Sequence, residues 1–245
     1  MIFSCHNHST WSDGTASIRE MAEAARAAGV TVFGISDHLV LSPYGIVDWS
    51  LAVEKFHDYC AEAKALKREL SGDGFEMRVG VEADYFPETV DELKALVAAG
   101  QLDYVIGAIH YAGPFPIDHQ RSDWEGLSEA QRHRVWEIYL EKLRGMAAVR
   151  GLWSWIAHLD LPKKYGFPLP DDLRDEMARC LHGIADAGLA IELNLAGLDK
   201  PCAEAYPAPE WLQLAKRLSI PIVTSADGHA TGQITRHYDL LPQLL

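Results

Sequence analysis

The segment Ile2-Phe3-Ser4-Cys5-His6-Asn7-His8 combines a short apolar run with two histidines two positions apart, and it sets the fold of the chain. In an extended strand, side chains two positions apart point the same way, so His6 and His8 can bind one metal ion. The turn Ser12-Asp13-Gly14 follows and adds a carboxylate. This start predicts a strand, Ile2–Cys5, whose carboxyl end leads into metal ligands.

Six further apolar runs of strand length follow, separated by longer amphipathic segments. The seven predicted strands are Ile2–Cys5, Val30–Ile35, Met77–Ala83, Tyr104–Ile109, Trp153–Ala157, Ala190–Leu193 and Ile220–Thr224. The predicted helices, which carry apolar residues at helical spacing, are Ser17–Ala28, Ser50–Leu70, Glu88–Ala99, Ser128–Val149, Asp171–Ala187 and Pro209–Leu218. Ser17 and Glu20 have the spacing of a capping box, and Gly29 is typical of a helix end.

About seven strand–helix alternations, without a linker rich in Pro, Gly or Ser, predict one α/β domain over residues 1–245 with a parallel sheet. The length suits a (β/α) barrel, and a doubly wound open sheet is the alternative. The long loops follow the carboxyl ends of strands, where parallel α/β folds place their chemistry. These loops are Leu39–Asp48, Ala112–Leu127, Leu161–Pro170 and Ala196–Ala208.

Most of the later strands also end in an imidazole or a carboxylate. The segments that carry them are Ser36-Asp37-His38, Val81-Glu82, Ile109-His110, Ala157-His158 and Asp227-Gly228-His229. A single histidine at a strand end is more often a hydrogen-bonded structural residue than a metal ligand. Six histidines and three carboxylates at one edge of one sheet instead indicate a metal site, because burying so many titratable groups without a cation is costly.

These nine ligands supply nitrogen and oxygen and no thiolate, which suits zinc, iron or manganese. Nine ligands also exceed what one ion can use, so we expect three divalent ions. The predicted ligand set is His6, His8, Asp13, His38, Glu82, His110, His158, Asp227 and His229.

The composition limits the class of partner. Lys and Arg total 22 against 35 Asp and Glu, so the formal net charge is −13, which disfavours long nucleic acid and anionic membranes as partners. No apolar stretch has the length of a transmembrane helix and the N-terminus does not resemble a signal peptide. Four scattered cysteines indicate reduced thiols and a cytoplasmic location. The sequence gives no indication of oligomeric state.

The ordered motifs HxH, SDG, SDH, a strand-end Glu, AHLD and DxH resemble the PHP (polymerase and histidinol phosphatase) superfamily from His6 to His229. The segments Ala157–Tyr165 and Glu192–Leu198, with Tyr206–Glu210, resemble stand-alone histidinol-phosphatases. The resemblance implies a distorted (β/α)7 barrel with a trinuclear centre at the carboxyl ends of the strands. It assigns His6, His8, Glu82 and Asp227 to one ion, Glu82, His110 and His158 to a second, and Asp13, His38 and His229 to a third.

The implied activity is hydrolysis of a small phosphomonoester, with L-histidinol phosphate the expected substrate and a metal-activated hydroxide the nucleophile. Glu82, Asp227 and Asp160 are the predicted catalytic residues, with Asp160 orienting His158 or protonating the leaving group. Lys164, Tyr165 and Lys200 are the predicted phosphate contacts.

One position departs from the family pattern. Histidinol-phosphatases usually carry a phosphate-binding arginine where this chain has Asp199, and a lysine such as Lys200 or Lys164 lacks the bidentate fork of arginine. A nucleotide or other small-ester phosphodiesterase is therefore an alternative, and a non-enzymatic metal-binding scaffold is a second.

The negative net charge of the chain does not exclude an anionic substrate, because the site itself has a different balance. Three divalent ions contribute six positive charges, and the carboxylates of Asp13, Glu82 and Asp227 contribute three negative ones. The site would then carry about +3 before a hydroxide binds.

Overall fold

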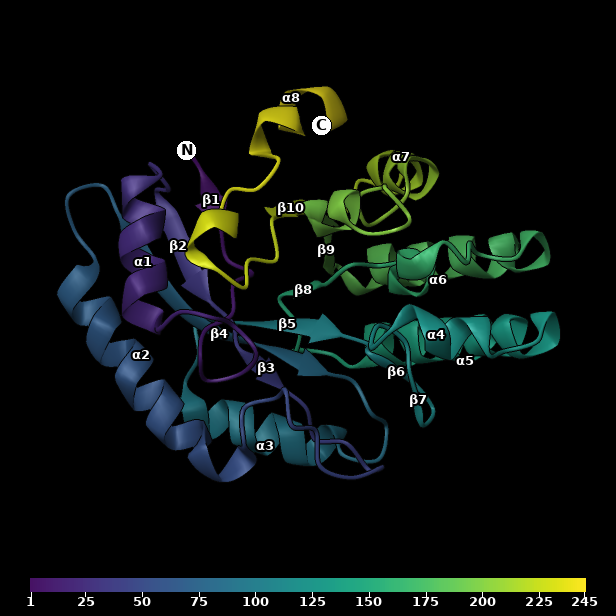
Figure 1. Ribbon diagram of the computed structural model, residues 1–245, viewed down its shortest axis with the longest axis horizontal. Helices are drawn as coiled ribbons and strands as arrows, with labels where there is room; N and C mark the ends of the chain where they lie inside the picture. Colours follow the sequence, from purple (N-terminus) through teal and green to yellow (C-terminus); the bar gives the residue numbers. More distant parts are fainter. The chain divides into compact units, whose positions relative to one another are not determined.

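The computed structural model describes residues 1–245, which divide into two compact units. Unit 1 contains Met1–Ile106 and Thr224–Leu245, and unit 2 contains Gly107–Val223. The chain passes from one unit to the other inside strand β5 (Tyr104–Ala108) and returns inside strand β10 (Ile222–Ser225) (Figure 1).

Unit 1 is built on parallel strands in the order β1-β2-β4-β5. The strands beside β5 are β1 (Phe3–Ser4), β2 (Val32–Ile35) and β4 (Glu76–Asp84). A two-residue strand, β3 (His38–Leu39), pairs with the end of β4, and this register places His38 opposite Glu82. β2 and β4 are buried over nearly their whole length, as expected for parallel strands covered on both faces.

Three α-helices of unit 1 follow its strands, and α1 and α2 lie side by side next to β2 and β4 (Figure 1). They are α1 (Ile18–Ala27), α2 (Phe56–Leu70) and α3 (Val90–Gly100). The predicted capping box of Ser17 and Glu20 is present at the start of α1. The C-terminal segment forms two 3₁₀ helices, η5 (Thr231–Gln233) and η6 (Tyr238–Leu240), and a last turn α8 (Leu241–Leu244).

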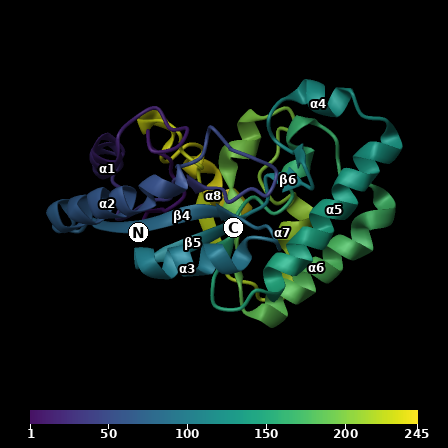
Figure 2. The ribbon, with the colours of Figure 1, turned by 90° about the horizontal axis from the view of Figure 1, so that it is seen from below.

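Unit 2 continues the parallel pattern in the order β5-β8-β9-β10. Its own strands are β8 (Trp155–Ile156), β9 (Ala190–Asn194) and the antiparallel hairpin of β6 (Tyr111–Ala112) and β7 (Phe115–Pro116). Its α-helices are α4 (Arg121–Glu125), α5 (Glu129–Ala148), α6 (Arg174–Ala187) and α7 (Pro209–Arg217). Figure 2 shows α5 and α6 running side by side.

Unit 2 also contains three 3₁₀ helices. Two of them lie in the loops that follow its strands, and one lies directly before α6. They are η2 (Leu161–Tyr165), η3 (Asp171–Leu173) and η4 (Leu195–Asp199). The segment η4 follows β9 directly, and η2 begins at Leu161, after the strand-end residues that follow β8.

All seven predicted strands are present, and two expectations about the connecting segments are corrected. The helix predicted from Ser50 begins at Phe56, after the 3₁₀ helix η1 (Val53–Lys55), because the Ser50 hydroxyl instead accepts the backbone N–H of Val40. The predicted long loop Ala112–Leu127 contains part of the β6–β7 hairpin and helix α4. No helix is both long enough and apolar enough to cross a membrane.

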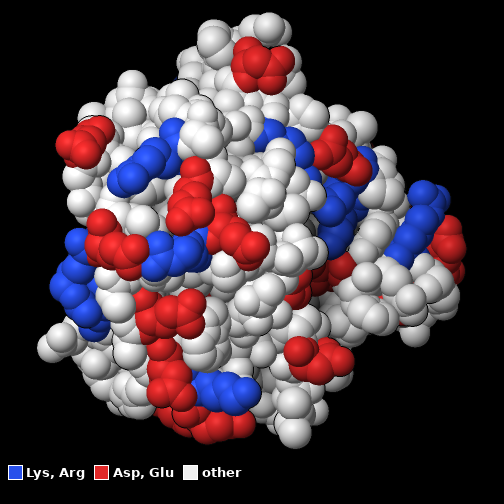
Figure 3. Space-filling view, turned by 60° about the vertical axis from the view of Figure 1, so that its left-hand side comes forward, with Lys and Arg blue, Asp and Glu red and all other residues white.

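Charged side chains of both signs are mixed on the face drawn in Figure 3. Exposed ion pairs of the chain include Arg19 with Glu69 and Lys67 with Asp103. This face shows no continuous basic surface.

Candidate metal centre and active site

His6 and His8 converge at the exit of β1, as their spacing predicted. Both are buried, and their Nε2 atoms lie 3.5 Å and 3.3 Å from one carboxylate oxygen of Asp227. Asn7 points the other way, where its side-chain amide donates to the carbonyl oxygens of Ser4 and Gly34. The amide of Asn7 therefore fixes the strand end that presents the two imidazoles.

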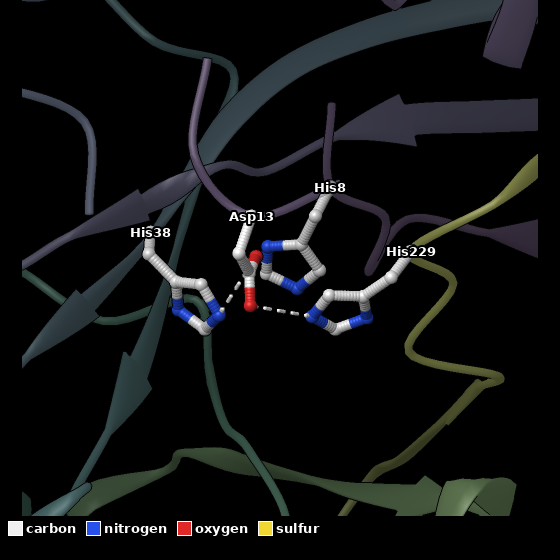
Figure 4. Close-up of side chains that lie close together, drawn as sticks. All are labelled: His8, Asp13, His38 and His229. Carbon is white, nitrogen blue, oxygen red and sulfur yellow. Dashed lines mark ion pairs between the residues drawn. The ribbon is translucent and has the colours of Figure 1, made fainter. Parts of the chain in front are cut away.

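His8 also belongs to a second cluster with Asp13, His38 and His229, whose ligand atoms all lie within 4.8 Å of one another (Figure 4). Asp13 sits between two of the imidazoles, with one oxygen 3.6 Å from His38 Nε2 and the other 3.3 Å from His229 Nε2. The ring of His8 stacks on those of His38 and His229, each with centroids 4.2 Å apart.

Glu82 joins the two clusters within unit 1. Its side chain is 1% exposed, and Oε2 lies 2.8 Å from His38 Nδ1, 3.1 Å from His6 Nε2 and 3.6 Å from His8 Nε2. One buried carboxylate oxygen that faces three imidazole nitrogens has the position expected of a ligand shared between ions.

The electrostatics of unit 1 fit a divalent cation. Burial, with repulsion from His38 and His229, lowers the pKa of His8 to about 3, so its imidazole is neutral. Burial alone would raise the pKa of Asp13 and Asp227, but the neighbouring histidines hold both well below the ordinary value. His8 Nδ1 is buried without a hydrogen-bond partner. The neutral imidazole of His8 and the ionised carboxylates of Asp13 and Asp227 are donors of the kind that a zinc-type ion requires.

The turn that carries Asp13 is held by Asp37, a residue to which the sequence assigned no role. The fully buried carboxylate of Asp37 accepts hydrogen bonds from the backbone N–H and hydroxyl of Ser9 at 2.7 and 2.8 Å. It also accepts the Ser12 hydroxyl at 2.6 Å. The sequence feature that could have indicated this role is the position of Asp37 directly before the predicted ligand His38. Gly14 closes the turn, because a Cβ there would lie 2.4 Å from the carbonyl oxygen of His8.

The turn that carries Asp227 and His229 is held by residues of the C-terminal segment. Asp227 has a left-handed backbone with φ of 51°, which is unusual for a residue other than glycine. The guanidinium of Arg236 donates to the carbonyl oxygens of Ala226 at 2.6 Å and Asp227 at 3.3 Å. Gln233 accepts the N–H of His229 at 2.9 Å.

Unit 2 contributes its own pair of predicted ligands, His110 and His158. Both are buried, and their ring centroids lie 5.0 Å apart. Glu192, on β9, accepts the backbone N–H of His158 at 3.3 Å and the side-chain amide of Asn194 at 3.0 Å. Glu192 had no predicted role, although a carboxylate between Ile191 and Leu193 in a buried strand was a signal.

Asp160 has contacts that fix the loop after β8. Its Oδ2 accepts the N–H of Ala208 at 2.9 Å and lies 3.0 Å from the ammonium of Lys163. Burial raises the pKa of Asp160, and Lys163 opposes that shift. The predicted part of Asp160 in proton transfer stays a prediction.

The predicted phosphate contacts Lys164 and Tyr165 lie side by side at the end of η2. Lys164 Nζ and the Tyr165 hydroxyl both donate to the carbonyl oxygen of Asp118, at 2.8 and 2.6 Å. On η4, Asp199 is exposed and Lys200, directly after it, is half-buried. The binding roles of Lys164, Tyr165 and Lys200 stay predictions.

Comparison with known proteins places these features in a family. The PHP domain profile matches residues 4–196. A relative from Deinococcus radiodurans, named a probable histidinol-phosphatase, is 35% identical over 220 residues, which cover 90% of this chain and 83% of the relative. The histidinol-phosphatase of Bacillus subtilis is 25% identical over 243 residues, with 91% and 90% covered.

Solved structures agree in fold. Histidinol phosphate phosphatase from Lactococcus lactis, complexed with zinc, L-histidinol and phosphate, has a TM-score of 0.80 at 20% identity, covering 99% of this chain and 93% of that one. A Listeria monocytogenes structure, described as a candidate histidinol phosphatase, has a TM-score of 0.82 at 23% identity over 96% and 98%. These likenesses confirm the predicted fold class, an α/β barrel of seven βα units. The chain belongs to the PHP domain family.

Proposed function

We propose that this chain is a metal-dependent phosphatase that hydrolyses L-histidinol phosphate to L-histidinol and phosphate. The observation that carries the proposal is the convergence of four imidazoles and three carboxylates in unit 1, with ligand atoms within 4.8 Å in each cluster. The histidinol-phosphatase names of its relatives from Deinococcus radiodurans and Bacillus subtilis support the substrate. The zinc, histidinol and phosphate of the Lactococcus lactis complex support it as well.

We propose that the site binds three divalent ions of zinc, iron or manganese. Their ligands would be the nine predicted ones, with Glu82 shared between two ions. When bound, such ions lower the pKa of water, orient the phosphate and offset the charge that develops on the leaving oxygen. The buried His6, His8 and Glu82 keep bulk water away from these positions.

The protein's own groups then bind and orient the ester. Lys164 would contact the phosphate as a point charge, with its ammonium fixed by Asp118. Tyr165, whose hydroxyl donates to the Asp118 carbonyl oxygen, would line the phosphate position beside Lys164, and Lys200 would add a second positive charge. Asp160, which is buried and has a raised pKa, would orient His158 or supply the proton to the leaving alcohol.

A small phosphorylated molecule is therefore the proposed partner, and long nucleic acid is not. The proposed location is the cytoplasm, which the four free cysteines support because they match a reducing compartment.

Phosphate release from three esters tests the proposal. The esters are L-histidinol phosphate, AMP and bis(4-nitrophenyl) phosphate, each assayed with added zinc or manganese and after treatment with a chelator. We expect histidinol phosphate to have the highest kcat/KM by at least 100-fold, and we expect the chelator to abolish its hydrolysis. Lys164→Met should raise KM for histidinol phosphate about 10-fold or more, because one charge-assisted contact is lost.

Three other results would contradict the proposed activity. Preferred hydrolysis of the bis-ester would favour a phosphodiesterase, consistent with the acidic Asp199. Absence of turnover with all three esters and both metals would favour a metal-binding scaffold. Full activity in the presence of the chelator would contradict the metal-dependent mechanism.

A further inference from the structure

Asp118, in the loop between β7 and α4, has a fixed backbone and an open carboxylate. Its carbonyl oxygen accepts two hydrogen bonds, from Lys164 Nζ at 2.8 Å and from the Tyr165 hydroxyl at 2.6 Å. Its carboxylate has one longer contact, 3.3 Å from Oδ2 to the same Lys164 ammonium, and the side chain is 28% exposed. The backbone bonds therefore hold Asp118 in place, while its carboxylate remains available for a ligand.

The carboxylate lies in a cationic part of unit 2. Burial raises the pKa of Asp118, but Lys164, His110 and His158 together lower it below the ordinary value, so the group is ionised. His110 and His158 are predicted metal ligands and Lys164 is a predicted phosphate contact. An ionised carboxylate this near them repels a phosphate dianion. That repulsion is unfavourable unless another part of the substrate is positively charged.

We propose that Asp118 is a specificity-determining residue that selects phosphate monoesters whose alcohol carries a cationic group. The inference rests on the proposed phosphatase function and deepens it by defining the substrate class. Phosphate is held at the metal ligands and Lys164, and the cation of the alcohol faces the open oxygen of Asp118. Histidinol carries an ammonium group two bonds from its ester-bearing carbon, so it belongs to this class.

The test uses a pair of esters that differ in charge and match in size. Phosphoethanolamine and propyl phosphate have chains of the same length, with an ammonium group in one and a methyl group in the other. The ratio of their kcat/KM values measures selection for the cation and does not depend on histidinol phosphate being the substrate. We expect wild-type enzyme to prefer phosphoethanolamine by 10- to 100-fold, and we expect Asp118→Asn to bring this ratio to within about 3-fold of one.

The rate on propyl phosphate separates recognition from a structural effect. Asp118→Asn keeps the backbone carbonyl that binds Lys164 and Tyr165 and removes a charge that repels phosphate, so kcat/KM for propyl phosphate should not fall and metal content should be unchanged. Asp123→Asn is the matched control, because Asp123 is a nearby carboxylate in the first turn of α4 and binds His119 and Gln120. It should leave the ratio at the wild-type value.

Three results would overturn the inference. One is an equal fall on both esters in Asp118→Asn, which would make Asp118 a support for Lys164. Another is an unchanged ratio in that variant. The third is wild-type enzyme without preference for the ammonium ester or without activity on either one. Failure of histidinol phosphate alone, with the ester ratio behaving as expected, would overturn only the proposed substrate.

Discussion

Asp37 Oδ1 accepts a 2.7 Å hydrogen bond from the backbone N–H of Ser9, the residue directly after the predicted ligand His8. The same carboxylate binds the hydroxyls of Ser9 and Ser12. Through these bonds a buried residue that touches no predicted ligand side chain sets the path of the loop from His8 to Asp13.

Asp37→Asn should therefore weaken both the fold and the metal site. The amide replaces one acceptor oxygen with a donor that faces N–H and O–H groups, so we expect a loss of about 2–4 kcal/mol in the free energy of unfolding. Metal affinity should fall about 10- to 100-fold, as for other residues that orient metal ligands. Urea unfolding and zinc titration measure the two effects. Asp58→Asn, an exposed carboxylate on α2, should change neither.

Gly14→Ala should remove the Asp13 ligand from its position. A Cβ at Gly14 would lie 2.4 Å from the carbonyl oxygen of His8 and 2.7 Å from the Ser9 nitrogen, so backbone atoms would have to move. We expect metal content per chain, measured by atomic emission, to fall by at least one ion. Gly183→Ala in α6 is the control, because nothing lies within 4 Å of a Cβ there. That change should keep the full metal content and raise the free energy of unfolding by about 0.5–1 kcal/mol. Equal metal content in both variants would show that the turn tolerates the methyl group.

Glu82→Gln should abolish hydrolysis while the chain remains folded. The amide keeps the shape of the side chain but loses the charge that faces His6 and His38, so we expect kcat to fall at least 1,000-fold and metal content to fall. Glu76→Gln, at the exposed start of the same strand, should retain wild-type kcat, since Glu76 binds only Arg78. Wild-type kcat in Glu82→Gln would remove Glu82 from the catalytic residues.

Metal affinity should increase with pH up to about pH 9. Burial lowers the pKa of His229, but the contact with Asp13 and the charge of Asp227 outweigh it and raise that pKa to about 9 in the metal-free protein. A metal ion needs the neutral imidazole, so binding at neutral pH releases this proton and becomes tighter as pH rises. Zinc titrations at several values between pH 6.5 and 9 measure the slope.

The raised pKa of His229 also predicts how the stability of the metal-free protein depends on pH. Because the folded pKa lies above the ordinary value of 6.5, the stabilisation from protonated His229 is complete below pH 6.5 and is lost as pH rises through about 9. Unfolding of the chelator-treated protein should show this loss, and His229→Gln should remove it. A metal affinity that does not change with pH, in wild type and variant alike, would contradict the assignment.

The grouping of the predicted ligand residues of unit 1 could be expected because strand geometry is local. Alternation along the segment that follows β1 places His6 and His8 on the same side, and parallel strands bring Glu82 and Asp227 to the same edge. The positions of the strands were predictable for the same reason, since each is a short apolar run followed by a helix.

The residues that hold the ligands were not predictable, because their roles depend on contacts between distant segments. Asp37 binds Ser9 across 28 positions, and Lys164 binds Asp118 across 46. The helix predicted from Ser50 failed for a related reason, since the Ser50 hydroxyl binds the loop after β3 and leaves the helix to begin at Phe56. Local propensity carries no information about such tertiary hydrogen bonds.

Unit 1 draws its ligands from both ends of the described chain, since His6 and Asp227 are 221 positions apart in the sequence. A metal ion bound by both residues would link the segment after β1 to the turn after β10. Without it, the segment after β10 is attached mainly through hydrogen bonds such as those of Arg236 and Tyr238. In the metal-bound protein, local unfolding of that segment would also break metal–ligand bonds. Bound metal should therefore protect the C-terminal region from proteases far more than it protects the surface loops of unit 2.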